Sequence, residues 1–203
     1  MSGLTREQTL TLRAPAKVNL FLEVCGKRPD GYHELRMFLA PISLCDQVHL
    51  EVLADEGRIE VLSDGGPHVP AGEGNLCHRA ARFYFAETGV AGGVRVRIAK
   101  SIPAGAGLGG GSSDAAVTIL GLERLYQRPL PEASRRKAAF AVGADVPFFF
   151  ARGPAWAEGI GEAVRPAPRF APLWLALVQS GAFLPTGQVF SRFTRGLTTP
   201  GTA

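Results

Sequence analysis

The stretch with the clearest chemical potential is rich in glycine and lies in the middle of the chain. The segment 94–98 before it alternates and predicts a strand, and the apolar spacing of 115–125 after it predicts a helix. Glycine permits positive φ and close approach of a ligand, and the first N–H groups of a helix attract anions. A strand, a glycine loop and a helix start therefore predict a phosphate-binding site. Its residues are Pro103, Ala104, Gly105, Ala106, Gly107, Leu108, Gly109, Gly110, Gly111, Ser112 and Ser113.

Two common phosphate motifs do not describe this loop. A Walker A loop needs a lysine after its last glycine, and here serine follows at once. Three of the glycines have the spacing of the short dinucleotide fingerprint, but the loop lies mid-chain and Glu123 falls inside the expected helix. A flexible linker fits poorly, because a proline and an amphipathic helix bound the loop. The best fit is a third kind of phosphate loop, in which Ser112 and Ser113 contact phosphate or magnesium, cap the helix, or do both.

Three polar residues outside the loop could also do chemistry. Lys17 and Asn19 alternate with apolar residues in 16–25, so as part of a strand they share one face. A charged lysine that leans inward is costly to bury unless it is paired. Asp145 stands just before the apolar run 146–150, which predicts a strand. From the residues alone, the simpler interpretations are an exposed strand lysine and a capping or turn aspartate.

Hydrophobic periodicity and turn residues predict the elements that must position these groups. Asn75 is expected to cap the first helix, and Cys45-Asp46 is expected to separate two strands. Strands are expected at 9–13, 16–25, 35–44, 47–53, 58–62, 93–99, 146–150, 155–158 and 174–179. Helices are expected at 76–88, 112–126, 131–142 and 186–195, with a disordered tail at 196–203.

Composition limits the class of protein. The 203 residues carry a net charge of +4 and are 46% apolar, which allows a core in one large domain or two small ones. No apolar run reaches the roughly 18 residues that span a membrane, and the N-terminus does not resemble a signal peptide. A cytoplasmic protein with reduced cysteines is expected. The histidines lack metal-ligand spacing, so no zinc site is expected. The basic run 135–137 fits a solvated helix face better than nucleic-acid binding.

Four segments together resemble the GHMP small-molecule kinases. They are 14–22 (APAKVNLFL), 28–33 (RPDGYH), the loop 103–113, and 143–148 (GADVPF). The loop alone would indicate only the superfamily. The other three are similar to the branch that phosphorylates a cytidine-diphosphate derivative of methylerythritol in the non-mevalonate isoprenoid pathway. The resemblance implies an α+β fold, with an N-terminal domain similar to domain 2 of ribosomal protein S5 and a ferredoxin-like C-terminal domain.

The resemblance also implies roles for individual residues. The reaction would be ATP-dependent phosphorylation of the substrate's 2-hydroxyl with Mg2+, which needs a held triphosphate and a hydroxyl that loses its proton. The loop would hold ATP. Asp145 would accept the proton, and Lys17 would favour both the carboxylate and the developing alkoxide. For the aromatic residues among the substrate contacts given next, simple packing in a turn without a ligand remains the alternative interpretation. Positions expected to contact the substrate, partly by stacking on cytosine, are Asn19, Tyr32, His33, Thr186 and Phe190.

The sequence departs from the family pattern after Phe190. Family members continue and carry a third glycine-rich motif, which is absent here. The expected division is an N-terminal ATP- and substrate-binding domain at 1–153 and the start of a shortened C-terminal domain at 154–203. An inactive nucleotide-binding fragment and another GHMP small-molecule kinase are the alternatives, although 30–33 (DGYH) favours a cytosine substrate. The expected partners are ATP and the small-molecule substrate, without nucleic acid or membrane, in a monomer or homodimer.

Overall fold

The computed structural model describes residues 8–65, 68–179, 189 and 192. Its strands are β1 (Thr9–Lys27), β2 (His33–Leu53), β3 (Ile59–Ser63), β4 (Gly93–Ala99), β5 (Ala155–Gly159) and β6 (Ala163–Pro166). Its helices are the short 3-10 helix η2 (Gly72–Gly74), α1 (Leu76–Thr88), α2 (Gly110–Leu125), α3 (Glu132–Ala141) and α4 (Val146–Phe150). The expected α+β class is confirmed.

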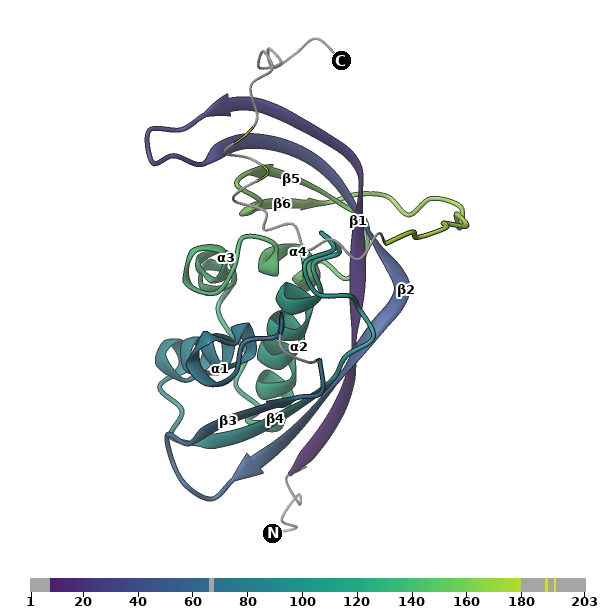
Figure 1. The fold of residues 1–203 in the computed structure, drawn as a ribbon. Helices are drawn as coiled ribbons and strands as arrows, with labels where there is room; N and C mark the ends of the chain where they lie inside the picture. The colour runs from purple at the N-terminus through teal and green to yellow at the C-terminus, as the bar shows by residue number, and fades with distance from the viewer. Residues whose placement is uncertain (1–7, 66–67, 180–188, 190–191, 193–203) are drawn as a thin grey trace.

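Within the described chain, the strands form one six-stranded sheet around β2. β1 runs antiparallel to β2 along one edge, while β4 and β5 pair with the two ends of its other edge. β3 joins β4 in parallel, and β6 joins β5 antiparallel. The long strands β1 and β2 curve around the helices, which cover the concave face (Figure 1). The site residues of the sheet therefore lie where the concave face meets α2 and α4.

The core lies between this concave face and the helices. Asn75 caps α1 as expected, since its side chain accepts a hydrogen bond from Cys77 N at 2.9 Å. Buried apolar side chains from the sheet pack against α1 and α2 and fix α2 across the middle of the sheet. The largest contributors include Leu39, Val48, Leu50, Val94, Val96, Tyr84, Ile119 and Leu122.

Two of the expected breaks between strands are wrong. The segments 9–13 and 16–25 form the single strand β1, and 35–44 and 47–53 form β2. Asp46 lies inside β2 opposite Ala14 and is fully buried, although aspartate is more typical of turns. It is tolerated there because its carboxylate accepts two main-chain hydrogen bonds and faces the ammonium of Lys100.

The expected strand at 146–150 is instead the short helix α4. Pro147 lies in its first turn, where the fixed φ suits a helix and the missing N–H costs nothing, whereas a central strand would need that N–H. The strand β6 was not expected. It is short, and its pairing with β5 depends on a tertiary contact that the sequence pattern does not show.

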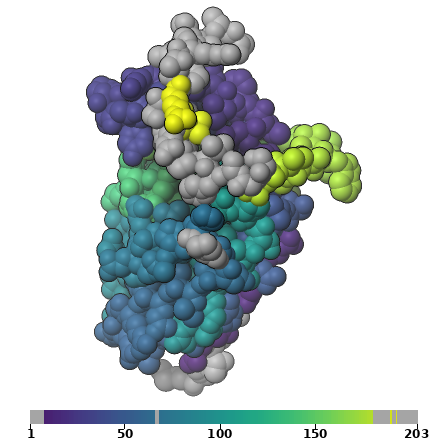
Figure 2. Space-filling view, in the orientation of Figure 1, coloured from purple at the N-terminus to yellow at the C-terminus, as the bar shows by residue number. Residues whose placement is uncertain are grey.

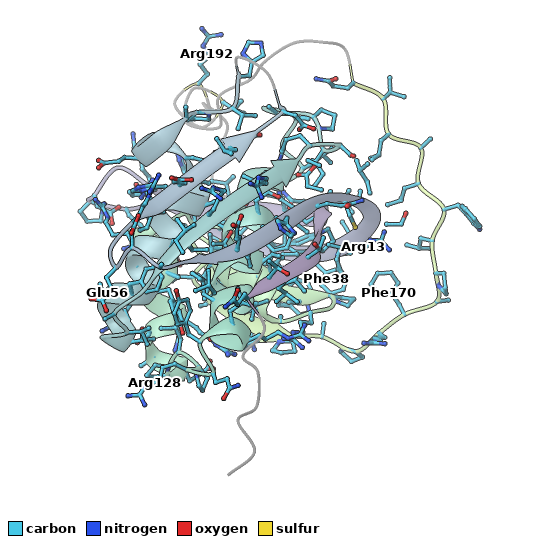
Figure 3. All side chains as sticks on the ribbon, turned by 90° about the horizontal axis from the view of Figure 1, so that it is seen from below. Arg13, Phe38, Glu56, Arg128, Phe170 and Arg192 are labelled. Carbon is cyan, nitrogen blue, oxygen red and sulfur yellow. The ribbon has the colours of Figure 1, made fainter. Side chains whose placement is uncertain are left out.

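The expected strand at 174–179 is also wrong. This segment has no ladder partner in the described chain and extends away from the body (Figures 1 and 2). Trp174 is 101% exposed and Val178 is 95% exposed. The chain leaves the sheet after Pro166, the last residue of β6, and the ring centroid of Phe170 lies 6.0 Å from that of Phe38 (Figure 3). An apolar alternating pattern forms a strand only where a neighbouring strand supplies hydrogen bonds.

Two expectations for the C-terminal part are not settled by these elements. The expected helix 186–195 and tail 196–203 lie outside the described residues, apart from 189 and 192. β5 and β6 continue the sheet of β2, and the domain division at 153/154 stays a prediction. Among the described helices, none has the length and apolar character needed to cross a lipid bilayer.

Candidate active site

The glycine-rich loop connects β4 to α2 and uses left-handed backbone at three positions. The φ angles of Gly105, Gly107 and Gly109 are 70°, 73° and 70°, which side chains other than glycine rarely adopt. Gly109 is the N-cap, so α2 begins at Gly110, two residues earlier than expected. The first main-chain hydrogen bond of the helix runs from Ser113 N to Gly109 O at 2.9 Å. The three N–H groups before Ser113 have no partner within the helix.

The two serines occupy the first turn of α2 and do not cap it. The N-cap is a glycine, and the helix has no side-chain capping bond. The Ser113 hydroxyl is buried and has no hydrogen-bond partner among the described residues. A Cβ placed on Gly143 would lie 3.6 Å from Ser112 Oγ, so the start of α2 packs against the segment that leads to Asp145. A buried hydroxyl without a partner is costly in a folded protein unless a ligand supplies one.

Lys17 lies on β1 at a shift in the register between β1 and β2. The register changes between Pro15 and Lys17, so Ala16 and Lys17 are both buried although they are adjacent in a strand. The main-chain N–H of Lys17 donates to Leu108 O at 2.9 Å, which attaches β1 to the loop. Its ammonium donates to Asn19 Oδ1 at 3.1 Å, so the expected shared face of the two residues is observed.

Asp145 reaches the same place from the other side. Its Oδ2 lies 3.9 Å from Lys17 Nζ, and the two side chains are 32% and 8% exposed. Although Asp145 precedes α4, its side chain makes no capping hydrogen bond. The carboxylate is therefore available to a ligand and lies beside a mostly buried cation. Loop, lysine and aspartate, which are far apart in the sequence, form one site.

The turn that contains Tyr32 and His33 is held by Arg28 and Asp30. Arg28 N donates to Tyr32 O at 2.7 Å, and Asp30 Oδ1 accepts from Tyr32 N at 3.2 Å. The hydrogen bond from Arg28 lowers the pKa of the Asp30 carboxyl below its ordinary value. Arg28 also lies 3.7 Å from Glu162 in the turn between β5 and β6. The Tyr32 side chain is 59% exposed, which leaves its ring accessible.

The link from this turn to Asp145 runs through the β5–β6 connection. A Cβ placed on Gly161 would lie 3.0 Å from Ala144 O, next to Asp145. The structure thus connects the Tyr32 turn to the Lys17–Asp145 pair through Glu162 and Gly161. Thr186 and Phe190, the two other expected substrate contacts, lie outside the described residues.

A buried ionic cluster next to the loop was missed by the sequence analysis. Lys100 Nζ lies 2.5 Å from Asp46 Oδ2 and 2.7 Å from Asp114 Oδ2; the two aspartates are buried, and the Lys100 side chain is 9% exposed. The available signal was one aspartate between two segments with strand patterns and a second one directly after Ser113. Burial raises the pKa of the Asp114 carboxyl to about 7, more than the neighbouring Lys100 lowers it. Burial lowers the pKa of Lys100, but the two carboxylates more than compensate and raise it.

The raised pKa of Asp114 predicts a pH-dependent stability. An unfolded aspartate titrates near pH 4, so between about pH 4 and pH 7 the folded protein binds more protons than the unfolded chain. The free energy of unfolding should therefore fall as the pH rises through this window. In Asp114→Asn, the downward slope should be shallower by up to about 1.4 kcal/mol per pH unit. Urea unfolding at several pH values measures the slopes, and equal slopes for the two proteins would contradict the prediction.

Gly109 offers a test of how closely the loop packs on Lys17. An alanine there would adopt left-handed backbone, which costs about 1–2 kcal/mol, and its Cβ would lie 3.0 Å from Lys17 Cγ and 3.2 Å from Phe149 Cζ. Gly57 has the same backbone (φ 75°) with nothing within 4 Å. We expect Gly109→Ala to lower the free energy of unfolding by about 1–3 kcal/mol more than Gly57→Ala. Equal losses in denaturant unfolding would argue against close packing.

The chain is similar to known proteins over most of its length. The family profile described as "GHMP kinases N terminal domain" matches residues 75–153. The 4-diphosphocytidyl-2-C-methyl-D-erythritol kinase of Citrifermentans bemidjiense is 44% identical over 191 residues, which cover 94% of this chain and 67% of the relative. The kinase of that name from Burkholderia thailandensis is 47% identical over 178 residues, covering 88% of this chain and 59% of the relative.

Solved structures give the same result. A crystal structure of a 4-(cytidine 5'-diphospho)-2C-methyl-D-erythritol kinase is 40% identical and matches with a TM-score of 0.69, over 90% of this chain and 63% of that chain. The mevalonate kinase of Methanococcus jannaschii matches at 18% identity with a TM-score of 0.58, over 81% of this chain and 57% of that chain, which supports the fold alone. The expected GHMP kinase fold is confirmed. The chain spans about three fifths to two thirds of the length of these kinase relatives.

Proposed function

The chain belongs to the 4-diphosphocytidyl-2-C-methyl-D-erythritol kinases of the GHMP kinase family, and on this premise we propose that it transfers the γ-phosphoryl group of ATP to the 2-hydroxyl of 4-diphosphocytidyl-2-C-methyl-D-erythritol. The observation that carries the proposal is the meeting of three parts at one place: the glycine loop, the ammonium of Lys17 and the carboxylate of Asp145. Each supplies something that phosphoryl transfer to an alcohol needs.

The loop is the proposed site of the ATP phosphates. Its left-handed glycines turn the main chain before α2, and the N–H groups of the first turn lack helical partners. Unpaired N–H groups and the positive end of the helix dipole bind phosphate oxygens. Because these donors are fixed before ATP arrives, they can stabilise the charge that builds up on the leaving ADP.

The Ser113 hydroxyl fits a contact to phosphate or to Mg2+. It is buried in the first turn of α2 without a protein partner among the described residues. Mg2+ bound to a nucleotide takes most of its ligands from phosphate oxygens and water and needs few from the protein. When bound, the ion would neutralise charge on the phosphates.

Asp145 is the proposed general base. The oxygen of the 2-hydroxyl attacks the γ-phosphorus, the bond from that phosphorus to the bridging oxygen of ADP breaks, and the hydroxyl proton passes to the Asp145 carboxylate. A carboxylate that is about one third exposed and makes no capping bond can take this proton. Lys17, held by Asn19, stabilises both the carboxylate before transfer and the negative charge on the attacking oxygen.

We place the cytosine of the substrate at the Tyr32–His33 turn. The exposed Tyr32 ring can stack on a base, and His33 can hydrogen-bond its edge. Thr186 and Phe190 remain proposed contacts on the basis of family resemblance. A phosphorylated metabolite and ATP as substrates favour a cytoplasmic location, and monomer or homodimer stays a prediction.

Release of ADP by the purified chain with Mg2+ and ATP tests the proposal. Release should depend on the cytidine-diphosphate substrate and should not occur with mevalonate or homoserine. The alternative is a nucleotide-binding fragment that binds ATP without transferring its phosphoryl group. ATP binding without substrate-dependent ADP release would support that alternative and contradict the proposal.

A further inference from the structure

The buried cluster of Asp46, Lys100 and Asp114 connects both ends of the glycine loop. We infer that this cluster holds the loop in its phosphate-binding shape, with Asp46 as the positioning residue; the inference rests on the proposed function. Its members come from three elements. Asp46 lies in β2, Lys100 follows β4, and Asp114 lies near the start of α2.

Asp46 fixes the start of the loop directly. Its Oδ1 accepts hydrogen bonds from Ser101 N at 2.5 Å and Ile102 N at 2.8 Å, while its Oδ2 faces Lys100 Nζ. Three consecutive residues are thus attached to one carboxylate. Because Asp46 is part of the central strand of the sheet, the loop begins at a position fixed by the core.

Lys100 extends this connection to the end of the loop. Its ammonium also donates to Asp114 Oδ2 at 2.7 Å, one turn into α2. A Cβ placed on Gly110 would lie 3.0 Å from Ile102 Cγ2 and 3.3 Å from Lys100 Nζ. The residues before the loop therefore pack against the first turn of α2, and the cluster joins the two by charge.

The part of the loop around Gly107 needs support of this kind because it has little packing of its own. Glycine loses more conformational entropy on ordering than any other residue, and a Cβ on Gly107 would meet nothing within 4 Å. In its middle, the loop is attached to β1 by the bond from Lys17 N to Leu108 O. The cluster at its ends, this bond and the contact of Gly109 with Lys17 attach the loop to the sheet.

The need to hold β2 and β4 together does not explain why this cluster is buried. Glu51 and Arg95 already connect β2 and β4 on a partly exposed face, at 3.0 Å. Burying charge is costly, and apolar residues often replace buried ion pairs without loss of stability. Compared with an apolar residue, Asp46 accepts two additional hydrogen bonds from main-chain N–H groups. Through Lys100 it also adds a charged connection to α2. Both interactions act on the loop.

The test compares Asp46→Asn, Lys100→Met and the double variant with Glu51→Gln and Arg95→Met, a matched pair on the same strands. Calorimetry gives the Kd of Mg–ATP, and turnover gives the KM of the cytidine substrate. We expect the ATP Kd to rise roughly tenfold in each single cluster variant and little further in the double variant, because the residues act as a unit. The KM of the cytidine substrate should change less than about twofold, as should the ATP Kd of the control pair.

Folded cluster variants with the ATP affinity of the wild type would overturn the inference. Equal weakening of ATP and cytidine substrate would also overturn it, because it would indicate a general structural role. If Asp46→Asn does not fold, Asp114→Asn decides, since it removes one link to Lys100 and leaves the Asp46 main-chain bonds in place. A higher ATP Kd in Asp114→Asn supports the inference, and an unchanged one overturns it.

A separate outcome concerns the proposed function. If the wild-type chain binds no ATP, the proposed function fails. The attachment of the start of the loop to Asp46 is then measured by hydrogen exchange at the amides of Ser101 and Ile102. Faster exchange in Lys100→Met than in Arg95→Met supports the anchor, and equal exchange overturns it.

Discussion

Asp145→Asn should lower the turnover number by about two to four orders of magnitude, the usual contribution of a general base. The asparagine keeps the shape of the side chain but cannot accept the proton of the 2-hydroxyl. The KM of ATP should stay close to that of the wild type, because the loop holds the phosphates without this carboxylate. Steady-state ADP release, with ATP and the cytidine substrate varied in turn, separates the two effects.

The fold should survive this substitution. Asp145 is about one third exposed, its Oδ2 is 3.9 Å from Lys17 Nζ, and Lys17 Nζ keeps its hydrogen bond to Asn19 Oδ1 at 3.1 Å as a second partner, so we expect little loss of stability. Asp55→Asn serves as the control. It removes an exposed carboxylate that pairs with Arg58 at 2.8 Å in a remote turn, and it should leave turnover unchanged. Near-normal turnover in Asp145→Asn would contradict its assignment as the base.

Lys17→Met should lower turnover by about two to three orders of magnitude, which is typical for loss of one fixed group that stabilises transition-state charge. The methionine preserves the apolar stem that packs against Gly109 but removes the ammonium beside Asp145. Thermal unfolding and turnover should be measured on the same preparation. Stability should stay level or increase, because replacing a buried charge with an apolar side chain removes a desolvation cost.

A decrease in activity without a decrease in stability is the distinctive result for Lys17. If Lys17→Met loses both together, the side chain supports the fold, and the catalytic assignment is contradicted. Lys137→Met provides the control. Its exposed ammonium pairs with Glu87 at 3.5 Å on a helix away from the site, and its loss should change neither quantity appreciably.

Elements with local signals could be predicted from the sequence. Asn75 before an amphipathic run marks the start of α1, and the alternation of 93–99 marks β4. The glycine loop between strand and helix was predicted for the same reason, since each part depends on neighbours in sequence. The loop's contact with β1 at Leu108 joins residues far apart in the chain, and no pattern in the sequence contains it.

The errors occurred where tertiary contacts override local preference. The local pattern predicts a break between strands at Asp46, because it does not contain the groups more than fifty residues away that offset the cost of burying this carboxylate. The apolar run 146–150 suits a strand or a buried helix equally, and Pro147 decides for the helix. Lys17 and Asp145 could be named as candidates. Their 3.9 Å separation depends on a register shift in β1 that no side-chain alternation reveals.

The central claim is that this chain moves a phosphoryl group from ATP to the alcohol of its cytidine-diphosphate substrate. Phosphorus NMR of an equimolar mixture of the chain, Mg–ATP and that substrate tests it most directly. The account predicts one new phosphomonoester signal on the substrate for each ADP formed, with the substrate's diphosphate signals retained and no reaction in Asp145→Asn on the same timescale. A folded, ATP-binding chain that forms no phosphomonoester, or that forms only ADP and free phosphate, would contradict it.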